Sequence, residues 1–273
     1  MAALARNRGA GETDLLVFCD GARDESERAA VDAARAVAAA AAGFRSVTVD
    51  AAECHLGLAA SVISAVTRTL ESHEAAIVVE DDLETSPWFL DYMNRALAMY
   101  ADDDRVVSIH GYTPVPAERS FFLRGADCWG WGVWRRSWKI FDPDAAALVA
   151  GFTPQLRRRF DFDGAFPYFK MLKDQAAGRI DSWAVRFHAS AFLAGKLTLY
   201  PARTLVRNIG MDGSGTHCGI DAGLEAMPSP SPVDPAAEVV ESEAMREKFA
   251  ASFRASAPTL WRRVKGRLAR LWE

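Results

Sequence analysis

A short apolar run that ends in three consecutive carboxylates is the feature that most constrains this chain. Residues 75–79 (Ala-Ala-Ile-Val-Val) are followed directly by Glu80, Asp81 and Asp82. Small and β-branched residues in such a run predict a strand of a sheet that is covered on both faces. Charged side chains cannot continue into that core without partners, so the acids are expected at the carboxyl edge of the sheet. Open α/β sheets bind their ligands at this edge.

The acid triplet allows two interpretations. Three neighbouring carboxylates repel one another unless a cation lies between them. Hard divalent cations such as Mg²⁺ or Mn²⁺ bind carboxylate oxygens, and they often use one or two acids together with substrate phosphates. The alternative is a solvated loop that follows a strand, and the spacing of the acids does not decide between the two.

Short apolar runs alternate with helical patterns through the first 110 residues. This alternation predicts an α/β fold with a mixed, mostly parallel sheet flanked by helices. Asp20 and the acid triplet both follow predicted strands, so they can share one edge of the sheet. The predicted strands are 15–19, 46–49, 76–79 and 105–110, and the predicted helices are 24–42, 58–70 and 88–100.

Length and composition limit the class of protein. The chain has 273 residues, half of them hydrophobic, which is enough for one large domain or one domain with appendages. Its net charge of −4 argues against a nucleic-acid partner. The scattered cysteines predict neither a zinc site nor a disulfide framework, and with no signal-peptide or membrane-spanning pattern we expect a cytoplasmic protein. The cysteines are Cys19, Cys54, Cys128 and Cys218.

Three later segments carry candidate functional residues. The segment 128–134 places three tryptophans around two glycines, and Trp131 there is either part of a packed hydrophobic hinge or a wall for a sugar-like ligand. Asp181 precedes an apolar helical pattern and reads as its N-cap. The segment 206–217 contains Gly213, Ser214 and Gly215, a loop composition able to fold over phosphates, and ends at His217, a surface histidine or a metal or phosphate contact.

The C-terminal part divides at a proline-rich stretch. Residues 227–237 contain four prolines and two serines and predict a linker. We therefore expect a domain over 1–226 and a helical tail over 238–273. The stretch 259–273 is basic and amphipathic, which suits the anionic inner face of the cell membrane. Packing on the domain or on a second subunit is the alternative, because the apolar spacing is also heptad-like.

Taken together, these segments resemble the GT-A-fold nucleotide-sugar glycosyltransferases. More narrowly, the chain is similar to bacterial sugar transferases related to the N-acetylglucosaminyltransferase I family. The resemblance covers about residues 12–218. It rests on the order and spacing of Cys19-Asp20-Gly21, the segment 79–84 followed by Pro-Trp-Phe, the Trp-Gly-Trp-Gly segment, Asp181-Ser182-Trp183 and the Gly-Ser-Gly-Thr-His loop.

The resemblance implies a role for each site residue. Asp20 would contact the nucleotide base, Glu80 and Asp81 would face the ribose and the hydrated metal, and Asp82 would bind the cation, usually Mn²⁺. Asp181 would be the general base that deprotonates the acceptor hydroxyl. The loop ending at His217 would close over the diphosphate.

The activity implied is inverting, metal-dependent transfer of a sugar from a nucleotide diphosphate to a hydroxyl of a glycan or lipid-linked precursor. The resemblance also leads us to expect that the first βα unit of the family is missing here, which would expose a sheet edge or leave a gap beside Asp20. Eukaryotic members carry paired acids before the tryptophan, whereas this chain has Asp181 and then Ser182. The alternative is a catalytically impaired relative that binds nucleotide sugar or glycan. A nucleotidyltransferase would need a basic Gly-rich loop near the N-terminus, which the sequence does not contain.

Overall fold

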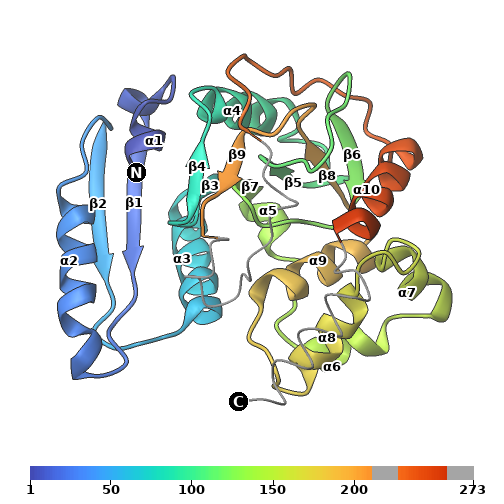
Figure 1. Ribbon diagram of the computed structural model, residues 1–273, viewed down its shortest axis with the longest axis horizontal. Coiled ribbons are helices and arrows are strands. Elements are labelled where there is room, and N and C mark those ends of the chain that lie inside the picture. The colour runs from blue at the N-terminus through green and yellow to red at the C-terminus, as the bar shows by residue number, and fades with distance from the viewer. Residues whose placement is uncertain (211–226, 257–273) are drawn as a thin grey trace, which may run out of the picture.

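The computed structural model describes residues 1–210 and 227–256. Helices and strands alternate through most of this range (Figure 1). The strands are β1 Asp14–Cys19, β2 Ser46–Ala51, β3 Ala75–Val78, β4 Leu83–Thr85, β5 Val106–His110, β6 Phe121–Arg124, β7 Trp131–Trp134, β8 Leu197–Tyr200 and β9 Val206–Asn208. The helices are α1 Ala2–Ala5, α2 Arg28–Ala39, α3 Leu58–Ser72, α4 Phe89–Met99, α5 Arg135–Trp138, α6 Ala145–Ala150, α7 Pro154–Phe160, α8 Tyr168–Ala176, α9 Trp183–Leu193 and α10 Glu243–Ser256.

A five-stranded sheet with the order β3-β7-β5-β8-β6 forms the centre of the molecule. β5 pairs with β8 in parallel, whereas β7 runs antiparallel to both β3 and β5, and β6 runs antiparallel to β8. β3, β5 and β8 therefore share one direction. At their carboxyl end, Val78, Trp131 and His110 lie side by side in one row across three strands.

The predicted α/β architecture with a mixed sheet and flanking helices is confirmed. The expectation of a mostly parallel sheet is not met in the strand pairing, because β5 and β8 form the one parallel pair of the described central sheet and its other three pairs are antiparallel. The strands predicted near 15–19, 46–49, 76–79 and 105–110 are all present. β6 and β7, which run against the common direction of the central sheet, follow the region in which the alternation of strands and helices had been traced. The assignment to the GT-A fold itself stays a prediction.

β1 and β2 form a separate, parallel two-stranded sheet. In the described residues β1 pairs with β2 alone and β3 pairs with β7 alone, so both β1 and β3 are edge strands. Neither strand contains a fully buried residue, although both are apolar, whereas every residue of β5 and β7 is buried.

Two hydrophobic cores cover the two faces of the central sheet. On one face α4 packs with Val106 and Ile109, and Ala10 and Val233 from the two ends of the described chain join the same core. On the other face α3, α5 and α9 pack around Trp131 and Val133. Alternate residues of β7 therefore enter opposite cores, as a strand buried on both sides requires.

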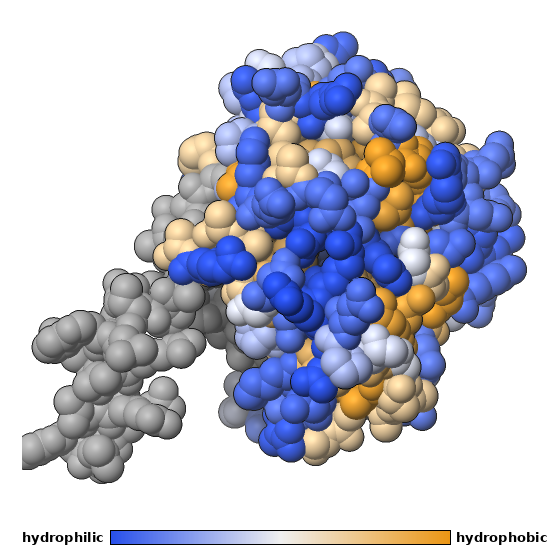
Figure 2. Space-filling model, turned by 90° about the vertical axis from the view of Figure 1, so that its right-hand side faces the viewer, coloured by the Kyte–Doolittle hydropathy of each residue, from blue (hydrophilic) through white to orange (hydrophobic). Residues whose placement is uncertain are grey.

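A helical cluster lies beside this sheet and surrounds α9 (Figure 1). Leu148, Phe160, Phe169 and Leu172 from α6, α7 and α8 pack against Phe192. Arg159 of α7 pairs with Glu241 at 2.6 Å, and Arg246 of α10 pairs with Asp163 at 2.7 Å. Figure 2 shows the right-hand side of the view in Figure 1, and hydrophilic residues predominate on this face.

The predicted linker 227–237 lies along the surface of the domain as an ordered strap. Carbonyl groups of this strap accept hydrogen bonds from Ser86 Oγ at 2.6 Å, from Trp88 Nε1 at 3.0 Å and from Tyr100 Oη at 3.1 Å. The strap therefore joins α10 to the same folded unit as the residues before it. The predicted amphipathic stretch 259–273 lies outside the described residues. None of the described helices combines the length and the apolar character needed to cross a bilayer.

Candidate functional site

The acid triplet forms the turn that joins β3 to β4. The N–H of Leu83 donates to the carbonyl of Glu80 at 3.1 Å, which closes a four-residue turn around Asp81 and Asp82. Glu80 and Asp82 are half-buried and Asp81 is exposed. The position of the acids at the carboxyl end of β3, predicted from the sequence, is confirmed.

β9 holds this turn from the other side. β4 and β9 pair antiparallel, with Leu83 opposite Asn208. The Asn208 side-chain amide donates to Oδ2 of Asp82 at 2.9 Å, and the N–H of Ile209 donates to the Asp82 carbonyl at 2.8 Å. A Cβ on Gly210 would lie 3.0 Å from Cβ of Asp82. The segment that leads into the glycine-rich loop therefore starts in contact with the predicted metal ligand.

Burial raises the pKa values of two of these acids. The pKa of Glu80 is raised to about 7 by burial, with the charges of Asp82 and Asp81 adding to the effect. Burial also raises the pKa of Asp82, which the Asn208 hydrogen bond opposes and the Asp81 charge reinforces. Two half-buried carboxylates are thus destabilised in their charged forms.

The chemistry of this donor set fits a hard divalent cation, which would relieve the repulsion between the carboxylates. Asp82 would be the direct ligand, since its carboxylate is fixed by Asn208. In residues 1–210 and 227–256, no three His, Cys, Asp or Glu side chains are arranged to hold a metal ion between them. A cation held by Asp82 would need further ligands, such as phosphate oxygens and water.

Asp20 organises its own part of the chain. Its Oδ1 accepts hydrogen bonds from the N–H groups of Gly21 and Leu56, both at 2.8 Å, and its Oδ2 accepts one from Gly57 at 3.0 Å. His55 Nδ1 lies 2.9 Å from the same Oδ2. Burial raises the pKa of Asp20, but these backbone hydrogen bonds outweigh burial and lower it overall. Because β1 belongs to the separate sheet, Asp20 and the acid turn do not follow hydrogen-bonded neighbours.

Trp131 is fully buried, so the packing interpretation of this residue is correct and the ligand-wall interpretation is wrong. Its side chain is 0% exposed and stacks on Trp183 with ring centroids 5.2 Å apart. Trp129, on the other side of Gly130, is half-buried and reaches the surface. Sequence spacing could not separate the two indoles, because the register of β7 decides which one faces the core.

Asp181 precedes α9 but does not cap it. Ser182 is the N-cap, and its Oγ accepts from the N–H of Val185 at 3.3 Å. The predicted capping role of Asp181 is therefore wrong, because the chain enters the helix one residue later. The Asp181 side chain is 62% exposed and lies 3.5 Å from Arg186. Trp183 stacks on Trp131, which pairs with Val78, so the start of α9 lies near the carboxyl end of β3.

The remaining predicted contacts, Gly213, Ser214, Gly215 and His217, lie outside the described residues. The sequence did not single out Asn208, because its role depends on the pairing of β4 with β9, strands that are far apart in the chain. The one available signal was its position just before the glycine-rich segment.

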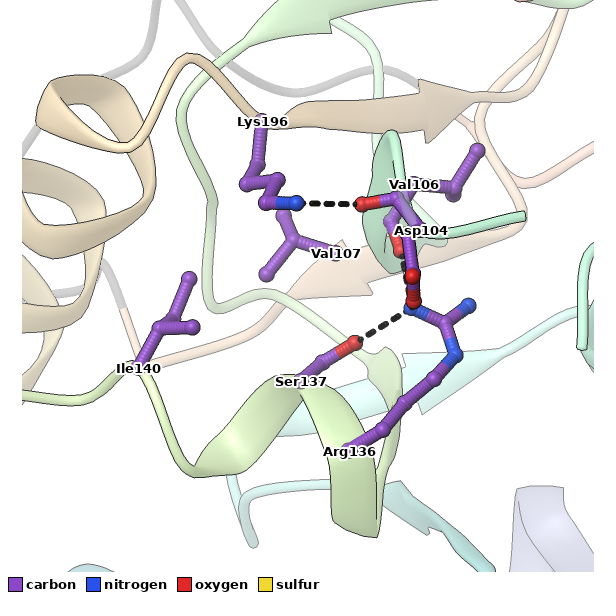
Figure 3. Close-up of a pocket in the computed structure, with 7 residues that line it drawn as sticks. All are labelled: Asp104, Val106, Val107, Arg136, Ser137, Ile140 and Lys196. Atoms are coloured by element: carbon purple, nitrogen blue, oxygen red, sulfur yellow. Dashed lines mark hydrogen bonds and ion pairs between the residues drawn. The ribbon is translucent and has the colours of Figure 1, made fainter. Parts of the chain in front are cut away.

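A small cavity of about 40 Å³ lies at the opposite, amino end of the central sheet (Figure 3). Lys196 Nζ donates to the Asp104 carbonyl at 2.7 Å, and Arg136 donates to the Val106 carbonyl at 2.9 Å. The charged groups of Lys196 and Arg136 thus hydrogen-bond to backbone carbonyls at the end of the sheet. We therefore assign this cavity no ligand.

No family model matches the sequence, and no curated protein matches it.

Proposed function

We propose that the chain is a metal-dependent, inverting glycosyltransferase that moves a sugar from a nucleotide-diphosphate donor to a hydroxyl of a glycan or lipid-linked precursor. One observation carries the proposal. A turn of three acids, two of them half-buried, follows β3, and Asn208 and Gly210, which precede the glycine-rich segment in the sequence, lie against Asp82. An acid turn beside a segment able to fold over phosphates is what a nucleotide-diphosphate site needs.

Each acid has a separate task in this reaction. Asp82 would hold Mn²⁺ or Mg²⁺, with Glu80 and Asp81 facing the hydrated ion and the ribose. The bound cation supplies Lewis-acid stabilisation of the leaving diphosphate. Asp181, exposed at the start of α9, would take the proton of the acceptor hydroxyl, a step worth roughly 10²–10⁴ in rate. One base and one displacement give inversion at the anomeric carbon.

Thermal unfolding with nucleoside diphosphates, with and without Mn²⁺, tests the donor site. We expect a rise in melting temperature that requires both nucleotide and metal, together with slow Mn²⁺-dependent hydrolysis of a nucleotide sugar. Asp82→Asn should abolish both effects, whereas the matched change Asp32→Asn at an exposed position on α2 should leave them unchanged. Equal turnover by the Asp82 variant and the wild type would overturn the proposal.

A catalytically impaired nucleotide-sugar or glycan binder is the second candidate function. It is favoured by the state of Asp20, whose two carboxylate oxygens already accept hydrogen bonds from Gly21, Leu56 and Gly57. Such a carboxylate has little capacity left for a nucleotide base, which weakens the donor site and favours the glycan-binding form of this candidate. Glycan or nucleotide binding without any hydrolysis, measured by calorimetry beside the activity assay, would identify this second function.

A further inference from the structure

We propose that the loop 126–129 forms a subsite for a hydroxyl-rich sugar ring of the acceptor, with Trp129 packing on the ring and Asp127 accepting hydrogen bonds from its hydroxyls. The inference rests on the proposed function, because the bound sugar is an acceptor only if the chain is a glycosyltransferase. It uses residues to which the proposed donor site assigns no role.

Two buried histidines hold this loop on both sides of Asp127. Nδ1 of His188, from α9, lies 2.6 Å from the Ala126 carbonyl oxygen and 3.1 Å from the Ala126 nitrogen, so the ring hydrogen-bonds to the backbone of Ala126 in either tautomer. Nε2 of His110, at the end of β5, accepts a hydrogen bond of 3.0 Å from the N–H of Trp129. A loop fixed at both ends by buried side chains is preorganised, and this lowers the entropy that a ligand must remove on binding.

Both histidines are neutral. Because Nε2 of His110 accepts a hydrogen bond, it carries no proton. Burial lowers the pKa of His110, and burial lowers the pKa of His188 to about 4. The loop is therefore fixed by dipoles, and neither ring brings a positive charge to neutralise Asp127.

The Asp127 carboxylate remains available to a ligand. Its side chain is 31% exposed. In the part of the chain that the structure describes, the one His, Lys or Arg side chain within 4 Å of this carboxylate is the neutral ring of His110, at 3.9 Å. Tyr200 donates a long hydrogen bond of 3.4 Å to Oδ2. Oδ1 accepts from the N–H of Cys128 at 2.8 Å, which orients the carboxylate and leaves further lone pairs on both oxygens.

Trp129 supplies the complementary apolar surface. Its indole is half-buried, and Tyr112 meets it edge-on with ring centroids 4.7 Å apart. A sugar ring has an apolar C–H face and a rim of hydroxyls. The face packs on an aromatic ring and removes apolar surface from water, while the rim needs hydrogen-bond acceptors of the kind that a carboxylate provides.

The position of the loop selects the acceptor over the donor. Asp127 contacts His110 and Tyr200, the last residues of β5 and β8, whereas the acid turn follows β3. β7 lies between β3 and β5, so the two sites are separated by two strand spacings, about 10 Å along the same end of the sheet. A donor diphosphate on Asp82 and an acceptor ring on Trp129 would thus approach each other across the start of β7.

The test uses the full chain on an immobilised glycan array, followed by calorimetry with the glycan that binds best. Asp127→Asn preserves the shape of the loop and should weaken glycan binding roughly tenfold to a hundredfold, the range expected for a lost charged hydrogen bond. Trp129→Phe keeps an aromatic ring and should weaken binding by a smaller factor. Asp104→Asn, a matched change of an exposed acid at the amino end of the sheet, should have no effect.

Nucleotide and metal binding gives the second readout. Both variants should keep the wild-type rise in melting temperature with nucleoside diphosphate and Mn²⁺. Glycan binding that is unchanged in the Asp127 variant, or a wild-type chain that binds no glycan, overturns the subsite and leaves the donor site standing. A wild-type chain that binds glycans through this loop but shows no response to nucleotide overturns the proposed function and leaves a glycan-binding loop.

Discussion

The side-chain amide of Asn208 donates a hydrogen bond of 2.9 Å to Oδ2 of Asp82 and accepts one of 2.8 Å from the N–H of Gly210. One side chain thus orients the predicted metal ligand and holds the backbone of Gly210, which precedes the glycine-rich loop in the sequence. The two contacts use the donor and the acceptor of the amide at once, so its orientation is determined.

Replacing Asn208 with alanine should reduce activity more than stability. The change removes two hydrogen bonds, which is expected to cost about 1–2 kcal/mol in the free energy of unfolding. Mn²⁺-dependent hydrolysis of a nucleotide sugar should fall at least tenfold, because Asp82 loses its orientation. Asn94→Ala, which removes a hydrogen bond on α4, serves as the control and should lower stability alone. Equal loss of activity in both variants would contradict the prediction.

Glu80→Gln should change the pH dependence of stability. The folded chain binds the Glu80 proton with a pKa of about 7, compared with 4.5 for an ordinary Glu, so the folded state holds more protons than the unfolded state between these values. The free energy of unfolding of the wild type should therefore fall as pH rises from 4.5 through 7, by up to about 3 kcal/mol from this residue. Glutamine does not titrate. Urea unfolding without metal should show the variant more stable at pH 8 and equal to the wild type at pH 4.

His188→Gln should reveal the opposite pH dependence, a loss of wild-type stability as pH falls. The folded chain resists protonation of His188 down to a pKa of about 4, whereas the unfolded chain takes up this proton near 6.5. The wild type should thus lose up to about 3 kcal/mol from this residue as pH falls from 6.5 through 4. The variant lacks this loss, so its difference from the wild type should shrink in acid. A constant difference from pH 8 to pH 4.5, measured by urea unfolding, would show that the ring is not kept neutral.

Gly210→Ala should impair activity through contact with Asp82. An added Cβ would lie 3.0 Å from Cβ and 3.1 Å from Oδ2 of Asp82, closer than ordinary van der Waals contact. We expect a severalfold loss of Mn²⁺-dependent hydrolysis with a change in stability below about 1 kcal/mol. Gly11→Ala meets no atom within 4 Å and is the control. If the activity of Gly210→Ala equals that of the control, the acid turn can adjust to the added Cβ without loss of function, which contradicts the prediction.

Asp20→Ala should destabilise the fold by about 1–3 kcal/mol, because the N–H groups of Leu56 and Gly57 lose a charged acceptor. If this structural role is the main one, binding of nucleotide by the intact variant should remain within a few-fold of the wild type. Urea unfolding and calorimetry measure the two effects separately. A large loss of nucleotide affinity without loss of stability would instead support a contact with the base.

Local patterns were sufficient to predict β1, β2, β3 and β5 and the helices α2, α3 and α4, because each depends on the periodicity of its own residues. The short strand β4 was not predicted. Local patterns were insufficient for β6 and β7, which reverse direction within the sheet, and for the pairing of β4 with β9. These features depend on contacts between residues that are distant in the chain, and in the pairing of β4 with β9 the partners Leu83 and Asn208 are more than a hundred positions apart. The proline-rich composition of 227–237 likewise gave no sign that Trp88 and Tyr100 would donate to its carbonyls.

In the candidate site, the acids at the end of β3 were predicted correctly because charge after an apolar run has few other solutions. The neighbouring assignments depended on single-residue register. Ser182 rather than Asp181 caps α9, and Trp131 rather than Trp129 is buried. The hydrogen bonds from the N–H groups of Leu56 and Gly57 to Asp20 depend on the path of the loop before α3, which no short motif encodes.

The separation of the two sheets also has a consequence for motion. Strand β1 shares its ladder with β2 alone, and no residue of either strand is fully buried, whereas β5 and β7 are enclosed on both faces. Local opening follows the density of buried contacts, so amide protons of β1 and β2 should exchange with deuterated solvent well before those of β5 and β7. The unit from β1 to β2 would then behave as the first foldon to open, while the rest of the domain stays closed.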